Sequence, residues 1–90
     1  MNIVWVNGTF DILHTGHLAM LKFASRLGDV LCVGIDSDER IKQKKGKSRP
    51  INSQYFRKEL LQSLFYVDKV YVFDTDYQLE KYVRFVSLFL

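Results

Sequence analysis

The stretch that decides the fold of this 90-residue chain is Asn7-Gly8-Thr9-Phe10-Asp11-Ile12-Leu13-His14-Thr15-Gly16-His17-Leu18. An apolar strand pattern over residues 3–6 leads into it, and apolar residues at helical spacing lead out of it. Small residues in the turn let the backbone approach a ligand closely. A helix that begins at His17 would direct its free N–H groups and positive dipole end at that turn. The pattern therefore predicts a phosphate-binding turn between a strand and a helix.

The rest of the chain alternates strand and helix patterns in the order β-α-β-α-β-α. We expect strands at 3–6, 30–35 and 69–73, helices at 17–27, 54–65 and 77–86, a helical turn at 39–41 and a loop at 46–52. Gly28 is expected to close the first helix in a left-handed conformation, and Ser53 to cap the second. This alternation predicts a single domain, residues 1–90, with a parallel α/β sheet and right-handed crossovers. Ligands of such sheets lie beyond the carboxyl ends of the strands, where residues 8–17, residues 36–49 and the turn at Asp74 meet.

Composition limits the class of protein. Nearly half of the residues, 48%, are apolar and seven are Phe, which is typical of a globular chain. The single cysteine, Cys32, lies in an apolar strand pattern and is interpreted as a buried core residue in a reducing compartment. No secretory signal and no stretch long enough to span a bilayer is visible. We therefore expect a cytoplasmic protein that does not bind a membrane.

A basic run follows the second predicted strand: Arg40, Lys42, Lys44, Lys45, Lys47 and Arg49. Such a run is compatible with a solvated loop, with nucleic-acid binding or with a phosphate-binding loop. No aromatic residue interleaves the lysines, so nucleic acid is not the expected partner. The run lies at the same sheet edge as the histidine motif, and this placement favours phosphate binding.

The pattern G-x-F-D-x-x-H-x-G-H resembles the signature of the cytidylyltransferase-like nucleotidylyltransferases. Its six fixed positions are Gly8, Phe10, Asp11, His14, Gly16 and His17. Family-like segments continue through most of residues 3–76, and residues 34–51 with 73–76 look most like the adenylyltransferase domain of ADP-heptose synthases. Glycerol-3-phosphate cytidylyltransferases are nearly as similar. The resemblance implies a Rossmann-like fold with sheet order 3-2-1-4-5.

Two features of the family are missing from this sequence: a strand with a Lys-Gly-x-Asp segment, and an Ile-Ser-Thr-Thr motif that opens a helix. We therefore expect a truncated form of the family fold, with one wall of the nucleotide crevice. Strand 3–6, central in the family, would then be an edge, and a homodimer across it, helped by Phe85, Leu88, Phe89 and Leu90, is the expected remedy.

The reaction that the resemblance implies is nucleotidyl transfer from ATP or CTP to a small phosphorylated substrate, with Mg²⁺ and release of pyrophosphate. Catalysis of this kind rests on positioning and on neutralising phosphate charge. The implied catalytic residues are His14, His17 and Lys45. The implied nucleotide-binding residues are Gly8, Thr9, Phe10, Asp11, Gly16, Lys44, Lys47 and Arg57. Asp11 accepts hydrogen bonds only, so it is expected to orient a histidine or a magnesium-bound water.

Several alternatives remain at this stage. Two histidines three residues apart also suit zinc, although no third ligand at a suitable spacing is evident, and we predict no protein-bound metal site. Arg57 would equally pair with Glu59 or Asp68. Asp36 and Asp38 are as compatible with turns and caps as with ligand binding. The alternative function is a catalytically impaired remnant that binds nucleotide or associates with itself.

Overall fold

The computed structural model describes residues 1–87, and this part of the chain has the predicted α/β architecture. Its elements are β1 (Ile3–Gly8), α1 (Thr15–Ser25), β2 (Val30–Asp36), α2 (Asp38–Lys45), α3 (Gln54–Gln62), β3 (Lys69–Phe73) and α4 (Asp76–Ser87). The prediction for β3 is confirmed to the residue. Within residues 1–87, no helix has the length and apolar character that crossing a membrane would require.

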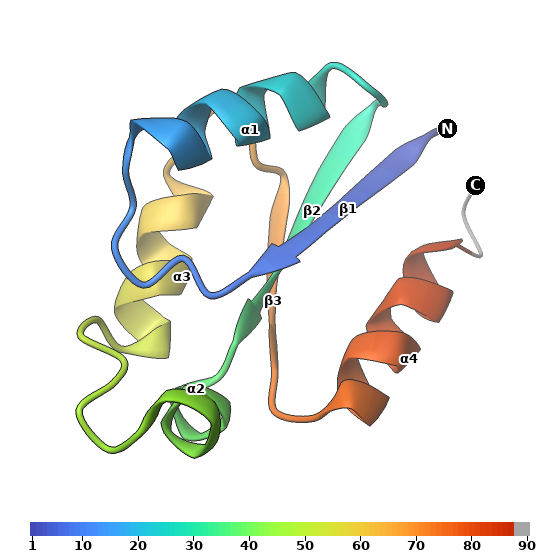
Figure 1. Ribbon diagram of the computed structural model, residues 1–90. Helices are drawn as coiled ribbons and strands as arrows, with labels where there is room; N and C mark the ends of the chain where they lie inside the picture. Colours follow the sequence, from blue (N-terminus) through green and yellow to red (C-terminus); the bar gives the residue numbers. More distant parts are fainter. Residues whose placement is uncertain (88–90) are drawn as a thin grey trace.

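The three strands of the described part form one parallel sheet in the order β1-β2-β3. Ile3 pairs with Val30 at one end of the β1–β2 ladder, and Asp36 pairs with Phe73 at the end of the β2–β3 ladder. This order matches the 3-2-1 portion of the sheet that the family resemblance implies. The sheet is covered by α1 and α3 on one side and by α4 on the other (Figure 1).

The side of the sheet that faces α1 and α3 holds the hydrophobic core. Alternate strand residues such as Val33 and Val70 point to this side, where they pack with Leu21 of α1 and Leu61 of α3. Leu21, Val33 and Leu61 are at most 1% exposed. Burial of these aliphatic side chains is the main stabilising contribution to the domain.

The side that faces α4 is built from aromatic rings and is less completely covered. Trp5 and Tyr71 stack with ring centroids 5.8 Å apart, and Tyr82 of α4 lies 5.1 Å from Tyr71. Gly34 makes this stack possible, because a Cβ at that position would lie 2.4 Å from the Trp5 ring. Beside the rings, a depression of about 580 Å³ opens to solvent, lined by Tyr71, Thr75, Tyr77, Gln78, Lys81, Tyr82 and Phe85.

The helical turn predicted at 39–41 is in fact the eight-residue helix α2. The Ser37 hydroxyl caps it by accepting the Arg40 N–H, and Ile41 anchors it in the interior. Asp38 and Glu39 lie in the first turn, and lysines in the last, as the helix dipole favours. Four residues of the basic run therefore lie in α2, and only Lys47 and Arg49 lie in the loop that follows it.

Two boundary predictions for α1 were wrong. The helix begins at Thr15 rather than His17, because the His14 side chain caps it. It ends at Ser25 with Arg26 as the C-cap, and Gly28 does not adopt a left-handed conformation. A Cβ on Gly28 would lie 2.8 Å from the Asn2 carbonyl oxygen, so close approach to the start of β1 explains the glycine. Likewise, α3 ends at Gln62, three residues before the predicted end.

Candidate phosphate site at the carboxyl edge of the sheet

The loop that leaves β1 turns sharply at Phe10. This residue has φ of 51°, a left-handed conformation that is uncommon for a bulky side chain. Phe10 is only 6% exposed, and its ring packs with the hydrophobic core beneath the loop. Gly8 leaves room for this ring, since a Cβ there would lie 3.1 Å from it. A strained residue held in place by burial is a recurrent feature of ligand-binding loops.

The two histidines of the motif cap α1 reciprocally. His14 Nδ1 accepts the Gly16 N–H at 3.1 Å, and His17 Nδ1 accepts the His14 N–H at 3.3 Å. The ring centroids are 3.9 Å apart. Because both Nδ1 atoms are acceptors, the proton of each neutral ring is on Nε2. The capping contacts therefore leave two Nε2–H donors next to the N-terminus of α1. A Cβ on Gly16 would lie 2.8 Å from the His14 ring.

His17 is packed more tightly than His14. It lies over the Phe10 ring, with centroids 5.1 Å apart. Burial, and then the neighbouring His14, lower the pKa of His17 below its usual value. Protonation of Nδ1 would also remove the acceptor of the His14 N–H. His17 is thus held as a neutral donor at neutral pH.

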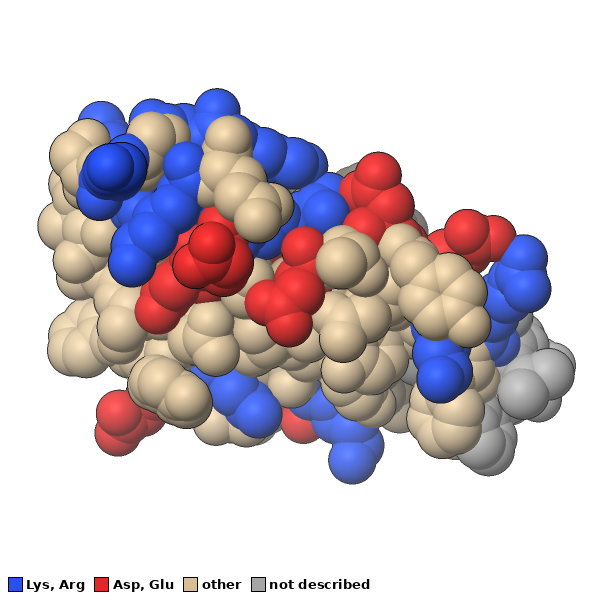
Figure 2. Space-filling model, turned by 90° about the horizontal axis from the view of Figure 1, so that it is seen from below, with Lys and Arg blue, Asp and Glu red and all other residues tan. Residues whose placement is uncertain are grey.

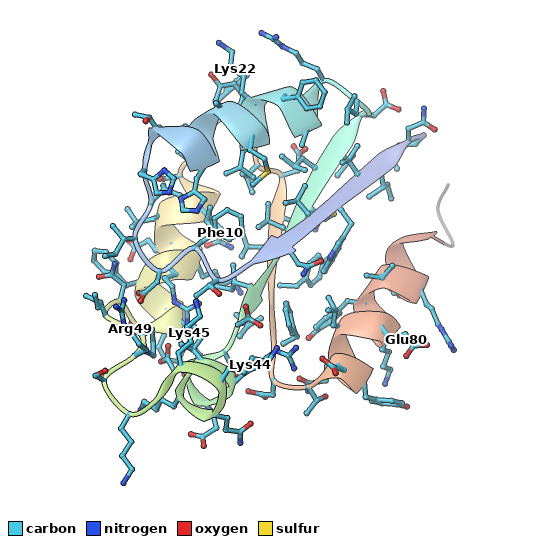
Figure 3. All side chains as sticks on the ribbon, viewed as in Figure 1. Phe10, Lys22, Lys44, Lys45, Arg49 and Glu80 are labelled. Atoms are coloured by element: carbon cyan, nitrogen blue, oxygen red, sulfur yellow. The ribbon has the colours of Figure 1, made fainter. Side chains whose placement is uncertain are left out.

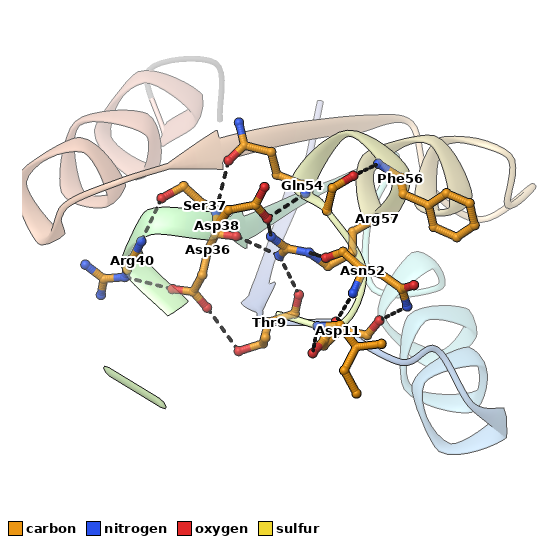
Figure 4. A network of polar contacts seen from close by, with 12 residues as sticks. Thr9, Asp11, Asp36, Ser37, Asp38, Arg40, Asn52, Gln54, Phe56 and Arg57 are labelled. Carbon is orange, nitrogen blue, oxygen red and sulfur yellow. Dashed lines mark hydrogen bonds and ion pairs between the residues drawn. The ribbon is translucent and has the colours of Figure 1, made fainter. Parts of the chain in front are cut away.

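Asp11 fastens a distant loop to this site instead of orienting a histidine. Its carboxylate accepts the N–H groups of Ile51 and Asn52 at 2.9 and 2.8 Å, and its carbonyl oxygen accepts the Asn52 amide (Figure 4). Burial alone would raise the pKa of Asp11. The two N–H donors, with the charges of Arg57 and Arg49, instead keep the pKa below its usual value. Asp11 therefore joins residues 46–52 to the histidine motif and orients neither histidine, while its predicted contact with a magnesium-bound water stays a prediction.

Arg57 is buried and does not reach a surface where a phosphate would lie. Its side chain is 0% exposed. The guanidinium donates to the carbonyl oxygens of Thr9, Asp36 and Asn52 at 3.0, 2.6 and 3.0 Å, and to the Asp38 carboxylate at 2.8 Å (Figure 4). The planar, multiply donating guanidinium suits such a junction. Arg57 is thus a clamp that holds the ends of β1 and β2 to α3, and neither Glu59 nor Asp68 is among these partners.

The aspartates that end β2 and begin α2 also serve the scaffold. Asp38 accepts the Gln54 N–H at 2.7 Å while the Gln54 side chain accepts the Asp38 N–H at 2.9 Å, so α2 and α3 cap each other. Asp36 accepts hydrogen bonds from Arg40 and from the Thr9 hydroxyl. The structure supports the cap interpretation for Asp38, whereas Asp36 is a strand residue that joins Arg40 to Thr9.

Sequence reasoning missed Asn52, the role of the Thr9 hydroxyl, and Arg40. Arg40 was grouped with the basic run, although it is 9% exposed whereas residues 42–49 are exposed. One signal was available, because Arg40 follows Asp36 by four positions, the spacing of a helical ion pair. Asn52 carried no comparable local signal.

The exposed lysines lie at the predicted edge of the sheet. Figure 2 views the carboxyl ends of the strands and shows Lys and Arg gathered on one half of that face, next to a group of Asp and Glu. In Figure 3, Lys44, Lys45 and Arg49 lie in the region below Phe10, whereas Lys22 lies on α1 at the far side. Lys44 and Lys45 end α2, and Lys47 lies in the following loop. The structure thus brings Lys44, Lys45 and Lys47 to the edge that also carries Gly8–Phe10, His14, Gly16 and His17.

This fold and its strand-end edge define a Rossmann-like α/β domain. The turn between β1 and α1 and a group of exposed cations lie beyond the strand ends. The domain's sequence matches the family described as cytidylyltransferase-like over residues 5–87, and the chain belongs to that family. The resemblance found in the histidine motif is thereby confirmed.

Curated relatives and a solved structure agree with this assignment. The chain is 51% identical over 78 residues to the bifunctional protein HldE of Campylobacter jejuni, covering 87% of this chain and 17% of the relative. It is 54% identical over 84 residues to HldE of Nitratiruptor sp., covering 91% and 18%. The lipopolysaccharide core biosynthesis protein from Thermoplasma volcanium superposes with a TM-score of 0.77 at 32% identity, covering 91% of this chain and 66% of that one. The chain thus spans less than a fifth of these curated relatives.

Proposed function

We propose that this domain transfers a nucleoside monophosphate from ATP or CTP to a small phosphorylated substrate. The observation that carries the proposal is the histidine pair, whose capping contacts leave two Nε2–H donors beside the N-terminus of α1, at the same edge of the sheet as the exposed lysines. Family membership over residues 5–87 supports it.

In the proposed reaction, an oxygen of the acceptor phosphate attacks the α-phosphorus of the nucleotide in line. The bond from the α-phosphorus to the bridging oxygen of the β-phosphate breaks, and pyrophosphate leaves with the electron pair. No protein nucleophile is required, so the side chains act by positioning and charge neutralisation. His14 and His17 donate from Nε2 to phosphate oxygens, and the backbone N–H groups of Thr9 and Phe10 support them. Lys45, with Lys44 and Lys47, holds the phosphates as mobile cations.

We propose that Mg²⁺ arrives with the nucleotide as part of the substrate. The carboxylates of Asp11, Asp36 and Asp38 already accept hydrogen bonds from protein donors. Among residues 1–87, no three His, Cys, Asp or Glu side chains are grouped so as to hold a metal ion. These two observations support a magnesium ion that is held mainly by the nucleotide phosphates.

For the acceptor, we propose a sugar phosphate. Two observations support this choice: the likeness of residues 34–51 to ADP-heptose synthases, and the structural neighbour, which is a lipopolysaccharide core biosynthesis protein. Glycerol phosphate is the second acceptor class, because the same motif occurs in glycerol-3-phosphate cytidylyltransferases.

A second candidate is a domain that binds nucleotide or a copy of itself without catalysis. The observation that favours it is the position of β1, which is an edge of the described sheet. Backbone groups along such an edge are available to another strand. The proposed occupant is a second copy of the chain. Nucleotide-dependent pyrophosphate release discriminates between the two candidates.

The test is pyrophosphate release from ATP and from CTP, with sugar 1-phosphates and glycerol 3-phosphate as acceptors. His17→Ala removes the donor, and we expect kcat to fall about 100-fold or more, as for loss of one preorganised donor, with a smaller effect on nucleotide binding. Lys22→Ala is the matched control, since it removes a charge at the opposite end of α1. Unchanged turnover in His17→Ala would contradict the catalytic role. Nucleotide binding without turnover in the unaltered chain would favour the second candidate.

A further inference from the structure

Arg40 is a buried cation at the carboxyl edge that the proposed reaction does not use. Its side chain is 10% exposed, and its ring partner is Phe73, 5.1 Å from the guanidinium carbon. Nε donates to Asp36 Oδ1 at 2.7 Å, and Nη2 donates to Asp76 Oδ1 at 2.6 Å. Arg40 thus joins the end of β2 to the start of α4.

The same Asp36 carboxylate reaches the phosphate turn. Its Oδ2 accepts the Thr9 hydroxyl at 3.2 Å, so one carboxylate holds Arg40 with one oxygen and Thr9 with the other (Figure 4). The Thr9 carbonyl oxygen is held separately by Arg57. The hydroxyl and the carbonyl oxygen of Thr9 are therefore both held, the hydroxyl through a chain that runs from Asp76 to Arg40 to Asp36.

The charge of Asp36 makes this chain relevant to an anionic ligand. The Asp36 side chain is 15% exposed and touches the turn that is proposed to receive a triphosphate. An uncompensated carboxylate in such a poorly solvated place repels phosphate strongly. Hydrogen bonds to Asp76 and Asp36 raise the pKa of Arg40, so its positive charge is present at every working pH.

We infer that Arg40 is a positioning residue of the nucleotide site, which neutralises Asp36 and through it holds Thr9 in the orientation that binds phosphate. This inference rests on the proposed nucleotidyl transfer. It assigns to Arg40 no contact with the substrate: the effect passes through Asp36.

A double-mutant cycle that removes the two charges separates this positioning role from direct phosphate contact by Arg40. The variants are Arg40→Gln, Asp36→Asn and the double variant, with Arg84→Gln as a control that removes the same charge near the far end of α4. One readout is Mg–ATP and Mg–CTP binding by calorimetry, and the other is hydrogen exchange of the Thr9 and Phe10 amides without ligand. Thermal unfolding by circular dichroism reports whether each variant folds.

We expect Arg40→Gln to weaken nucleotide binding about tenfold, equivalent to about 1.4 kcal/mol, and to speed exchange at Thr9 and Phe10. Asp36→Asn in the same chain should restore binding, because both charges are then absent. Equally weak binding in the single and double variants would overturn the inference in favour of direct phosphate contact by Arg40. Unchanged amide exchange in Arg40→Gln would overturn it as well.

Failure of this inference can be distinguished from failure of the proposed function. If the unaltered chain binds neither nucleotide, the proposed function fails, and amide exchange still decides whether Arg40 positions Thr9. If Arg40→Gln does not fold, Arg40→Lys keeps the charge and loses the second hydrogen bond. Binding within about threefold of the unaltered chain is expected for Arg40→Lys, because a compact ammonium still neutralises Asp36; a larger loss would overturn the charge argument.

Discussion

The two faces of the sheet are covered to different degrees. The side under α1 and α3 is a continuous aliphatic core that is sealed at the carboxyl edge by the Arg57 clamp. The side under α4 is a stack of three aromatic rings beside a depression that opens to solvent, and it borders the β1 edge of the described sheet. The comparison teaches that the side under α1 and α3 supplies the buried clamp of the phosphate turn, whereas the open side under α4 leaves aromatic surface uncovered next to the β1 edge, where another strand or chain can be added.

Loss of the Arg57 clamp should have the largest effect. Arg57→Met leaves three carbonyl oxygens and the Asp38 carboxylate without their donor, and we expect unfolding to become easier by about 3–5 kcal/mol. Arg57→Lys should recover little of this, because an ammonium cannot reach four separated acceptors. Urea denaturation followed by circular dichroism measures both.

Arg84→Met is the control for the clamp, since the Arg84 side chain is 78% exposed and pairs with Glu80 on the surface of α4. Its expected effect is within about 0.5 kcal/mol. If Arg57→Met lowered the free energy of unfolding no more than Arg84→Met does, the Arg57 clamp would not stabilise the side under α1 and α3, and the comparison of the two sides would be wrong.

On the open side, we expect self-association across β1. The predicted part of Phe85 in the dimer interface stays a prediction. The other residues predicted to help, Leu88, Phe89 and Leu90, lie outside the described residues. Trp5 is the natural probe, because it lies on the edge strand and faces the aromatic stack. Trp5→Lys places an inward-facing charge on the edge strand, a recurrent device against edge pairing, and circular dichroism checks that the variant folds without its ring stack. Sedimentation should show a dimer or larger species at micromolar concentration for the unaltered chain, and dissociation about tenfold easier for Trp5→Lys.

A monomeric unaltered chain over that range would remove the reason to regard the open side as an interface. A dimer that Trp5→Lys leaves unaffected would place the interface elsewhere. Lys22→Ala serves as a control, because it changes the charge of α1 on the other side of the sheet.

The sequence allowed the sheet to be predicted well, because its strands are local apolar runs. Residues 30–35 and 69–73 are strand-like regardless of tertiary context. Helices were predicted less accurately for two physical reasons. Histidine is not among the usual N-cap residues, so the start at Thr15 was missed. In α2, one buried isoleucine stands among charged residues, and the periodic apolar signal is correspondingly weak.

The candidate site divides in the same way. The histidine motif was found because its residues are consecutive and their geometry is set by one turn. The roles of Arg57 and Asp11 were not found, since their partners are remote in sequence: Thr9 lies 48 positions from Arg57, and Asn52 lies 41 positions from Asp11. Composition cannot show whether an arginine in a helix points outward to a ligand or inward to carbonyl groups.

The smallest predicted effect is on pH dependence, and it separates the two parts of the sealed edge. His17 has a lowered pKa in the folded chain, so its stabilising contribution is complete above about 6.5 and declines as pH falls below that value. Asp11 also has a lowered pKa, but as an acid its contribution persists down to about pH 4 and is lost only as pH falls through the folded value. Thermal unfolding from pH 8 to pH 3 should therefore show two separate declines in stability.

His17→Gln should abolish the decline below about pH 6.5 with little loss at pH 7, because glutamine at this position also accepts the N-cap N–H. Asp11→Asn should reduce the second, to which Asp76 with its own lowered pKa also contributes, and should lower stability throughout, since the amide oxygen replaces only one of two carboxylate acceptors. A first decline that persists in His17→Gln would show that the capping histidine is not the titrating group.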